Sequence, residues 1–292
     1  MNIFMDGRII SAADAVISPF DHGFLYGLGL FETLRTYQGR PALFSDHYRR
    51  LALAAEEIGI ALTMSEAELE NAIHTTMEAN RLQDAYIRVD LTAGKGDIGP
   101  YAGVYESPSW LIFAKPLPVF PPDFYRTGKR LQVLQTRRNK PEGAWRFKSH
   151  HFMNNRLAKR EIGSDPLAEG LFLTQKGFLA EGIVSNLFFV SQGALSTPAI
   201  ETGILPGTRR AYVLEIAKEM GVRVEEGYYS LESLLAADEI FLTNAVQEIV
   251  PVNSVSYVTG HGQTKRQEIG RGTIGYHTDL FLNRYRRGIL NK

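Results

Sequence analysis

A proline-rich segment near the middle of the chain most limits how this sequence can fold. Residues 115–122, KPLPVFPP, contain four prolines in eight positions. Proline fixes its backbone φ angle and has no N–H to donate, so the segment is stiff, extended and unable to join a central strand. A chain of 292 residues is also long enough for about two domains. We predict an N-terminal domain of residues 1–115, a linker of residues 116–122 and a C-terminal domain of residues 123–292.

The composition argues against several classes of protein. Basic and acidic residues balance at 32 each, so no net charge attracts nucleic acid or an anionic membrane. There is no cysteine, which rules out disulfides, Cys-bound zinc, iron–sulfur clusters and thiol nucleophiles, and fits a reducing cytoplasm. We expect no signal peptide, and no stretch reaches the roughly 18 apolar residues of a membrane span. The expectation is a soluble cytoplasmic protein with no nucleic-acid, membrane or metal partner.

Hydrophobic periodicity and turn residues predict mixed strands and helices before the linker. Asp6-Gly7 is a typical two-residue hairpin turn, and residues 65–68 form a capping box at the start of a helix. In residues 86–93 apolar and polar side chains alternate, as in a strand with one buried face. The other expected elements are strands over 2–5, 8–11, 30–37, 40–44 and 110–114, and a helix capped by Ser45 or Asp46.

After the linker, strands and helices continue without a regular βαβ period, which favours an α+β fold. Apolar residues at helical spacing predict a helix over residues 209–220, with Thr208 as its cap. From residue 257 we expect a loop and then a basic helix over residues 277–287. The remaining expected strands are 131–135, 170–174, 178–182, 186–190 and 240–243.

Lys148 is the first candidate for chemistry. It lies among aromatic residues in WRFKSHHF, residues 145–152. Partial desolvation and nearby cations favour the neutral amine, which can form a Schiff base. The alternative is a solvated surface lysine whose stem lies over aromatic rings.

Two loops carry backbone donors suited to phosphate. In ILPGTRR, residues 204–210, the N–H groups of Thr208 and Arg209 lie at the positive end of the predicted helix. The pair Asn244-Ala245 follows a predicted strand and suits a second set of donors. The alternative for the first loop is a plain Pro-Gly turn with a threonine cap.

A carboxylate enters an apolar strand in AEGIVSN, residues 180–186. A buried Glu181 needs a partner, either a protein cation or a protonated ring nitrogen of a cofactor. The small polar pair Ser185 and Asn186 can hold a bulge or anchor a ligand.

The order of these motifs resembles the fold-type IV pyridoxal-phosphate enzymes, the class IV aminotransferase family. The resemblance extends from about residue 2 to residue 252 and includes SPFDHGFLYG, FETLR and HYRRL in the first 51 residues. It implies a smaller N-terminal α/β domain, a larger β-rich C-terminal domain, pyridoxal 5'-phosphate as cofactor and a homodimer.

The resemblance also implies a role for each matching residue. Lys148 is similar to the Schiff-base lysine, and Glu181 to the carboxylate that binds the pyridine nitrogen. Members of the family have the pattern L-P-G-x-T-R where this chain has Leu205-Pro206-Gly207-Thr208-Arg209. The resemblance therefore does not determine which hydroxyl contacts the phosphate. The cofactor-binding positions that the resemblance implies are Arg50, Lys148, Glu181, Ser185, Asn186, Leu205, Thr208, Arg209, Asn244 and Ala245.

Within the family, residues 137–155 and 158–166 resemble the bacterial aminodeoxychorismate lyases. Thr33 falls where these lyases have a threonine implicated in catalysis, although some transaminases share it. The resemblance predicts conversion of a small molecule, 4-amino-4-deoxychorismate, into 4-aminobenzoate and pyruvate. A D-amino-acid or branched-chain transaminase is the alternative. Implied substrate contacts are Phe31, Tyr86 and Arg88, and for Arg88 a structural pair with Asp90 is the competing interpretation.

Overall fold

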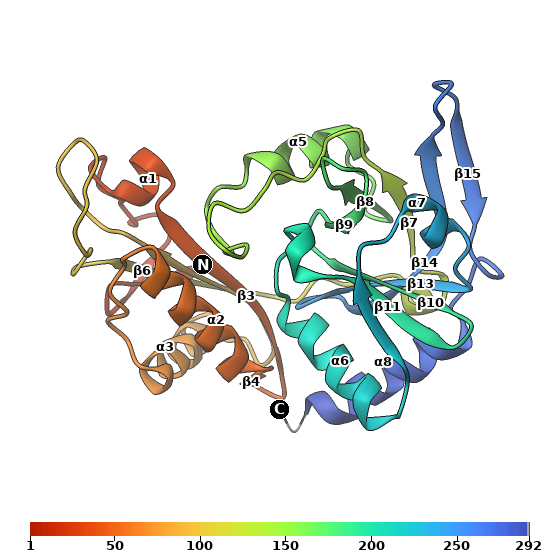
Figure 1. The fold of residues 1–292 in the computed structure, drawn as a ribbon. Coiled ribbons are helices and arrows are strands. Elements are labelled where there is room, and N and C mark those ends of the chain that lie inside the picture. Colours follow the sequence, from red (N-terminus) through yellow and green to blue (C-terminus); the bar gives the residue numbers. More distant parts are fainter. Residues whose placement is uncertain (291) are drawn as a thin grey trace. The chain divides into compact units, whose positions relative to one another are not determined.

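The computed structural model describes residues 1–290 and residue 292, and it contains two compact units (Figure 1). Unit 1 includes Met1–Val119 and Phe147–His151, and unit 2 includes Phe120–Arg146 and Phe152–Gly288. The chain first leaves unit 1 inside the proline-rich segment. The segment with Lys148 belongs to unit 1 rather than to the C-terminal part, since its backbone pairs with a strand of unit 1.

Unit 1 is built on a six-stranded antiparallel sheet with the order β2-β1-β6-β5-β3-β4. Two long helices, α2 (Phe44–Glu57) and α3 (Glu66–Ala79), lie along one face of it (Figure 1), and α1 (His22–Tyr26) is short. The strands are β1 (Asn2–Met5), β2 (Arg8–Ser11), β3 (Gly29–Tyr37), β4 (Arg40–Pro41), β5 (Tyr86–Thr92) and β6 (Ser109–Lys115).

The register of β3 and β5 separates an apolar face from a polar one. Leu34 lies opposite Ile87, and both side chains are fully buried in the core. On the other face Phe31 lies opposite Asp90 and Thr33 lies opposite Arg88. This confirms the predicted alternation, because directly opposed residues of an antiparallel pair point to the same side of the sheet.

Local sequence features set most of the turns and caps of unit 1. The Asp6-Gly7 hairpin is confirmed, with both residues at positive φ, and so is the capping box that begins at Ser65. The cap predicted for the preceding helix, α2, is wrong: Leu43, at φ 53°, occupies its N-cap, and neither Ser45 nor Asp46 does. Leu43 itself adopts the left-handed backbone conformation and packs in the core, so this helix begins without a side-chain cap.

Unit 2 contains a nine-stranded mixed sheet. Eight of its strands follow the order β12-β11-β10-β13-β14-β7-β8-β9, and the ninth, β15, pairs with β14. Its core includes Phe188 and Phe241, whose rings stack 5.1 Å apart. The strands are β7 (Lys129–Val133), β8 (Ala168–Leu173), β9 (Leu179–Gly182), β10 (Asn186–Ser191), β11 (Ala194–Pro198), β12 (Val224–Gly227), β13 (Glu239–Asn244), β14 (Glu248–Val258) and β15 (Thr264–Glu268). The helices are α4 (Phe124–Thr127), α5 (Met153–Ile162), the 3₁₀ turn η1 (Ile200–Thr202), α6 (Thr208–Glu219), α7 (Leu231–Leu235) and α8 (Tyr276–Ile289).

The loop predicted from residue 257 is wrong, whereas the helix expected near the end is confirmed as α8. Residues 254–258 of β14 pair with β15 in a hairpin that stands out from unit 2 (Figure 1). β15 has the sequence TKRQE and is mostly exposed. A strand exposed on both faces has no apolar alternation, so periodicity cannot detect it.

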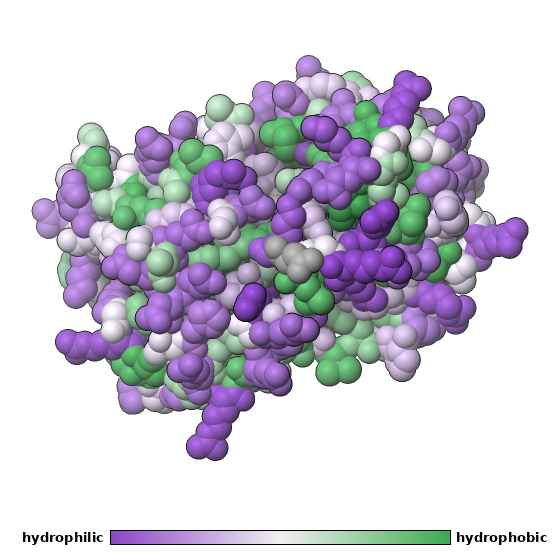
Figure 2. Space-filling view, turned by 90° about the horizontal axis from the view of Figure 1, so that it is seen from below, coloured by the Kyte–Doolittle hydropathy of each residue, from purple (hydrophilic) through white to green (hydrophobic). Residues whose placement is uncertain are grey.

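Among the described residues, no helix is both long enough and apolar enough to cross a membrane. The face shown in Figure 2 carries mostly hydrophilic side chains, interrupted by smaller apolar areas. The mixture of helices and strands in both units confirms the expected α+β class.

Candidate active site

Lys148 lies on a short extended segment that pairs with the beginning of β3. The N–H of Phe31 donates to the Lys148 carbonyl at 2.8 Å, and the N–H of His150 donates to the Gly29 carbonyl at 2.9 Å. Between them Leu30 and Ser149 form an antiparallel bridge. The segment therefore continues the sheet of unit 1 beyond β3, and its lysine is half-buried.

The Lys148 amine lies 4.4 Å from the centroid of the Phe31 ring. The guanidinium carbon of Arg88 lies 4.0 Å from the same centroid. Thr33 is half-buried on this polar face of β3, and the Tyr86 ring on β5 lies 4.5 Å from the amine of Lys115. The structure thus brings the predicted Schiff-base lysine together with Phe31 and Arg88 within unit 1. Tyr86 lies on the same strand as Arg88, where its ring contacts Lys115.

Asp90 is the acidic centre of this polar face. Arg88 binds it in a bidentate way, from Nε to Oδ2 at 2.7 Å and from Nη2 to Oδ1 at 2.6 Å. His150 Nε2 lies 2.8 Å from the same Oδ1. Burial acts to raise the pKa of Asp90, but the hydrogen bonds and charges of His150 and Arg88 outweigh it and hold that pKa below its usual range. The pair of Arg88 with Asp90, the competing interpretation from the sequence, is therefore present.

Arg50 projects from α2 toward the face of β3 that the helices cover. Its Nε and Nη2 donate to the two carboxylate oxygens of Glu32 at 2.8 and 2.6 Å, and His47 Nδ1 lies 2.7 Å from Glu32 Oε2. Burial alone would raise the pKa of Glu32, but the charges of Arg50 and His47 lower it far below its usual range. Arg50 is thus held in a fixed, buried geometry within unit 1.

Glu181, the last but one residue of β9, is buried in unit 2 and pairs with a protein cation. Arg138 Nε and Nη2 lie 2.9 and 2.8 Å from Glu181 Oε1, and the Leu205 N–H donates to Oε2 at 3.0 Å. A second guanidinium, that of Arg146, lies 3.7 Å from Oε1. Burial and the charge of Arg138 lower the pKa of Arg146 to about 10. Arg146 therefore stays charged at neutral pH, and two cations face one carboxylate.

Asn186 links the strands of unit 2 to the turn before α6. It lies opposite Thr243 in the pairing of β10 with β13, and its amide donates to the Leu205 carbonyl at 2.9 Å. A Cβ atom at Gly207 would lie 1.9 Å from Asn186 Oδ1, so only glycine fits that position without displacing the amide. The hydroxyls of Ser185 and Thr243 are buried and have no hydrogen-bond partner among the described residues.

The helix that follows this turn begins one residue earlier than predicted. Gly207 is the N-cap of α6 and Thr208 is its first residue, so the expected threonine cap is wrong. Glycine has no side chain to accept the first N–H groups, which leaves this helix end without a side-chain cap. Arg209 follows and is almost completely buried.

The turn that begins at Asn244 closes on itself. Asn244 Oδ1 accepts from the backbone N–H groups of Val246 and Gln247 at 3.0 and 2.7 Å. Ala245 lies between them and is half-buried. Elsewhere in unit 2, hydrogen bonds join Glu181 and Asn186 to Leu205, in the turn before α6.

Sequence reasoning missed three residues that organise these clusters. Arg138 and His150 were noted only within segments that carry a resemblance, and Asp90 only as the alternative partner of Arg88. Their partners are 43 and 60 residues away in the chain, so no local spacing links them. The one local clue was that Asp90 and Arg88 lie two residues apart, on the same face of one strand.

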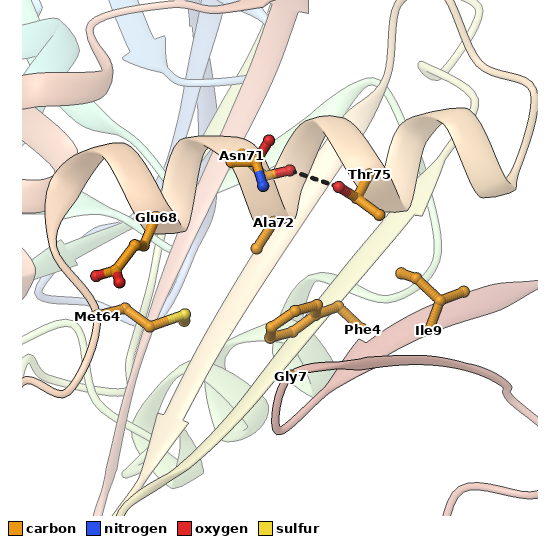
Figure 3. A pocket seen from close by; sticks show the side chains of 8 residues that line it. All are labelled: Phe4, Gly7, Ile9, Met64, Glu68, Asn71, Ala72 and Thr75. Carbon is orange, nitrogen blue, oxygen red and sulfur yellow. Dashed lines mark hydrogen bonds between the residues drawn. The ribbon is translucent and has the colours of Figure 1, made fainter.

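A pocket elsewhere in unit 1 contains none of the predicted site residues. It lies between α3 and the β1–β2 hairpin (Figure 3). Its acidic residue, Glu68, accepts hydrogen bonds from Ser65 in the capping box. The lining residues are Phe4, Gly7, Ile9, Met64, Glu68, Asn71, Ala72 and Thr75.

The sequence and the fold of this chain are similar to those of a known enzyme class. Residues 29–255 match the family model described as "Amino-transferase class IV". The aminodeoxychorismate lyase of Bacillus subtilis (strain 168) is 43% identical over 264 residues, which cover 90% of this chain and 89% of that protein.

Solved structures show the same similarity across the whole chain. The 4-amino-4-deoxychorismate lyase of Pseudomonas aeruginosa superposes with a TM-score of 0.83 at 28% identity, covering 98% of each chain. The branched-chain aminotransferase of Thermoproteus uzoniensis, solved with norvaline, superposes with a TM-score of 0.85 at 29% identity, covering 100% of this chain and 95% of the other. The chain therefore belongs to the class IV aminotransferase family and is an enzyme of that family.

Proposed function

We propose that this chain is a pyridoxal-phosphate-dependent 4-amino-4-deoxychorismate lyase, which makes 4-aminobenzoate and pyruvate in folate biosynthesis. The observation that carries the proposal is the 43% identity to a lyase of that name over nine-tenths of the chain. Site geometry agrees with it, because a lysine, an arginine and a threonine share one face of unit 1.

The residues of unit 2 fit the cofactor. Gly207 gives the start of α6 no side-chain cap, and a helix N-terminus is a favourable place for a phosphate group because the positive end of the helix dipole lies there. The buried hydroxyls of Ser185 and Thr243 lack partners among the described residues, and a bound polar ligand would satisfy them. Glu181 is a buried carboxylate held in place by Arg138, suited to keep a proton on the pyridine nitrogen. Arg50, Leu205, Thr208, Arg209, Asn244 and Ala245 are the further cofactor contacts that we propose.

Each catalytic residue has a defined task in this proposal. When bound, pyridoxal phosphate supplies a cationic ring that accepts electrons from the reacting carbon. The Lys148 amine holds the cofactor aldehyde and later removes the proton from the substrate carbon that carries the amine. The hydroxyl of Thr33, or Lys148 itself, gives a proton to the leaving enolpyruvyl group. Loss of that group leaves an aromatic ring.

Substrate binding is assigned to the polar face of unit 1. Arg88 uses Nε and Nη2 on Asp90, while its Nη1 has no hydrogen-bond partner among the described residues and can bind a substrate carboxylate. Phe31 and Tyr86 supply flat apolar surface for the substrate ring.

The alternative is a D-amino-acid or branched-chain transaminase on the same fold. The similarity to the Thermoproteus uzoniensis aminotransferase favours it. A transaminase would convert the cofactor to its amine form with an amino acid, whereas a lyase has no need to.

A direct assay separates these two functions. The purified enzyme is given 4-amino-4-deoxychorismate, and release of 4-aminobenzoate is followed by its fluorescence. We expect turnover in the wild type, none in Lys148→Ala, and a large fall in Thr33→Ala. Rapid amino-acid turnover without 4-aminobenzoate would refute the lyase assignment.

We also propose a cytoplasmic homodimer. Large apolar side chains are exposed on α1 and on the loop after β5, among them Phe24, Ile98 and Tyr101. Hydrogen bonds between His22 and Tyr105 and from the Gly99 N–H to Tyr26 join α1 to this loop, so the two segments lie side by side. A contiguous exposed apolar patch is typical of a protein interface. Light scattering at micromolar concentration tests the dimer. The cytoplasmic location is proposed from the sequence alone.

A further inference from the structure

Asp90 and His150 connect the Lys148 segment to the sheet of unit 1. We propose that they are positioning residues for Lys148: Asp90 holds His150, and His150 holds the segment so that the lysine amine keeps a fixed place beside Phe31. The inference deepens the proposed function and rests on the role of Lys148 as the residue that binds the cofactor.

The segment is attached to two different strands. Its backbone pairs with β3 through the Lys148 carbonyl and the His150 N–H. The His150 side chain reaches the neighbouring strand β5, where Nε2 lies 2.8 Å from Asp90 Oδ1. Attachment at two points stops the segment from rotating about the β3 edge, which backbone pairing alone leaves possible.

Gly29 makes room for this contact. A Cβ atom at Gly29 would lie 2.4 Å from His150 Nδ1 and 2.6 Å from Cε1. The imidazole therefore occupies the space that any other side chain at position 29 would fill. The space left by Gly29 and the hydrogen bond to Asp90 both specify one place for the ring.

Asp90 stays an acceptor because Arg88 balances its charge. The carboxylate faces Arg88 and His150, and one of its oxygens, Oδ1, accepts from both. Two lysines also lie near this face, Lys148 through its contact with Phe31 and Lys115 through its contact with Tyr86. A single carboxylate thus orients both the proposed substrate arginine and the lysine segment. A displacement of the lysine by about 1 Å is enough to weaken its reaction strongly.

The test compares two cofactor forms that differ in whether they can bond to Lys148. Apo-protein is titrated with pyridoxal 5'-phosphate, which reacts with the amine, and with pyridoxamine 5'-phosphate, which does not. His150→Phe keeps a flat ring but loses the hydrogen bond, and His150→Gln keeps a donor. His74→Gln, on the exposed surface of α3, is the matched control.

We expect His150→Phe to weaken binding of pyridoxal 5'-phosphate by about tenfold or more, the range for losing a hydrogen bond to a charged group. Binding of pyridoxamine 5'-phosphate should change by less than about threefold, because it does not use the lysine bond. His150→Gln should restore most of the loss, and His74→Gln should bind both forms as the wild type does. The pH at which the absorbance of the bound aldehyde form changes should shift in His150→Phe and should stay the same in His74→Gln.

A second pair of variants protects the test against misfolding. Asp90→Asn and Gly29→Ala each disturb His150 from a different side, and each should reproduce the selective loss. In combination with His150→Phe, Asp90→Asn should add little to the loss of binding of the aldehyde form, because both substitutions remove the hydrogen bond between Asp90 and His150.

An equal loss of both cofactor forms in His150→Phe would overturn the inference, as would unchanged binding of the aldehyde form. Neither result depends on aminodeoxychorismate. The outcome is therefore separate from the success or failure of the lyase assay.

Discussion

The close approach of Gly207 to Asn186 allows a stability prediction worked from distances. Gly207→Ala places a methyl group 1.9 Å from Asn186 Oδ1 and 3.1 Å from its Cγ. The backbone angles at Gly207, φ −69° and ψ 133°, are allowed for alanine, so the cost comes from the clash alone. The amide must move, and its 2.9 Å hydrogen bond to the Leu205 carbonyl is then lost.

Two effects of Gly207→Ala lower the free energy of unfolding, and one effect raises it. Overpacking costs about 1–3 kcal/mol, and the lost hydrogen bond costs about 1 kcal/mol. Lower entropy of the unfolded chain returns about 0.4–1 kcal/mol. Gly207→Ala should therefore destabilise the apo-protein by about 1–4 kcal/mol.

Urea unfolding of apo-protein measures this change, with Asn186→Ala and the double variant completing a thermodynamic cycle. In the double variant the clash is absent, so the two single costs should not add, and the coupling should exceed about 1 kcal/mol. Gly260→Ala is the control, because nothing lies within 4 Å of a Cβ atom there. Additive effects, or a Gly207→Ala cost equal to that of Gly260→Ala, would show that the contact with Asn186 does not limit this position.

Three other substitutions test buried polar groups. Glu32→Gln should lower the free energy of unfolding by about 3–5 kcal/mol at neutral pH. Folding lowers the pKa of Glu32 below 4.5, so this loss should be complete above pH 4.5 and should become smaller as the pH falls further. Urea unfolding in a His47→Gln background measures it, because His47 then adds no titration of its own. Arg138→Met leaves Glu181 buried and without its main partner, so unfolding should show a loss of about 3–5 kcal/mol, largely relieved by adding Glu181→Gln. Ser185→Ala removes a buried hydroxyl that lacks a partner among the described residues, so apo-protein stability should stay constant or rise slightly, while calorimetry should show weaker cofactor binding.

Local features of the sequence were sufficient for much of unit 1. The Asp6-Gly7 turn, the Ser65 capping box and the alternation along β5 are confirmed, because each depends on residues that are close together in the sequence. Elements without such a local pattern were missed or misjudged. Leu43 takes the N-cap of α2 because its packing in the core outweighs capping preference, and β15 has no apolar face.

For the active site, the sequence by itself determined the residue types and their order, and these were enough to identify the family and to select Lys148, Glu181 and the turn before α6. Tertiary structure alone decided what each of them contacts. Glu181 pairs with Arg138, and His150 with Asp90, across 43 and 60 residues of chain. Such pairs form only when segments far apart in the chain meet, and burial then makes a partner necessary, since an unpaired charge in the interior is costly.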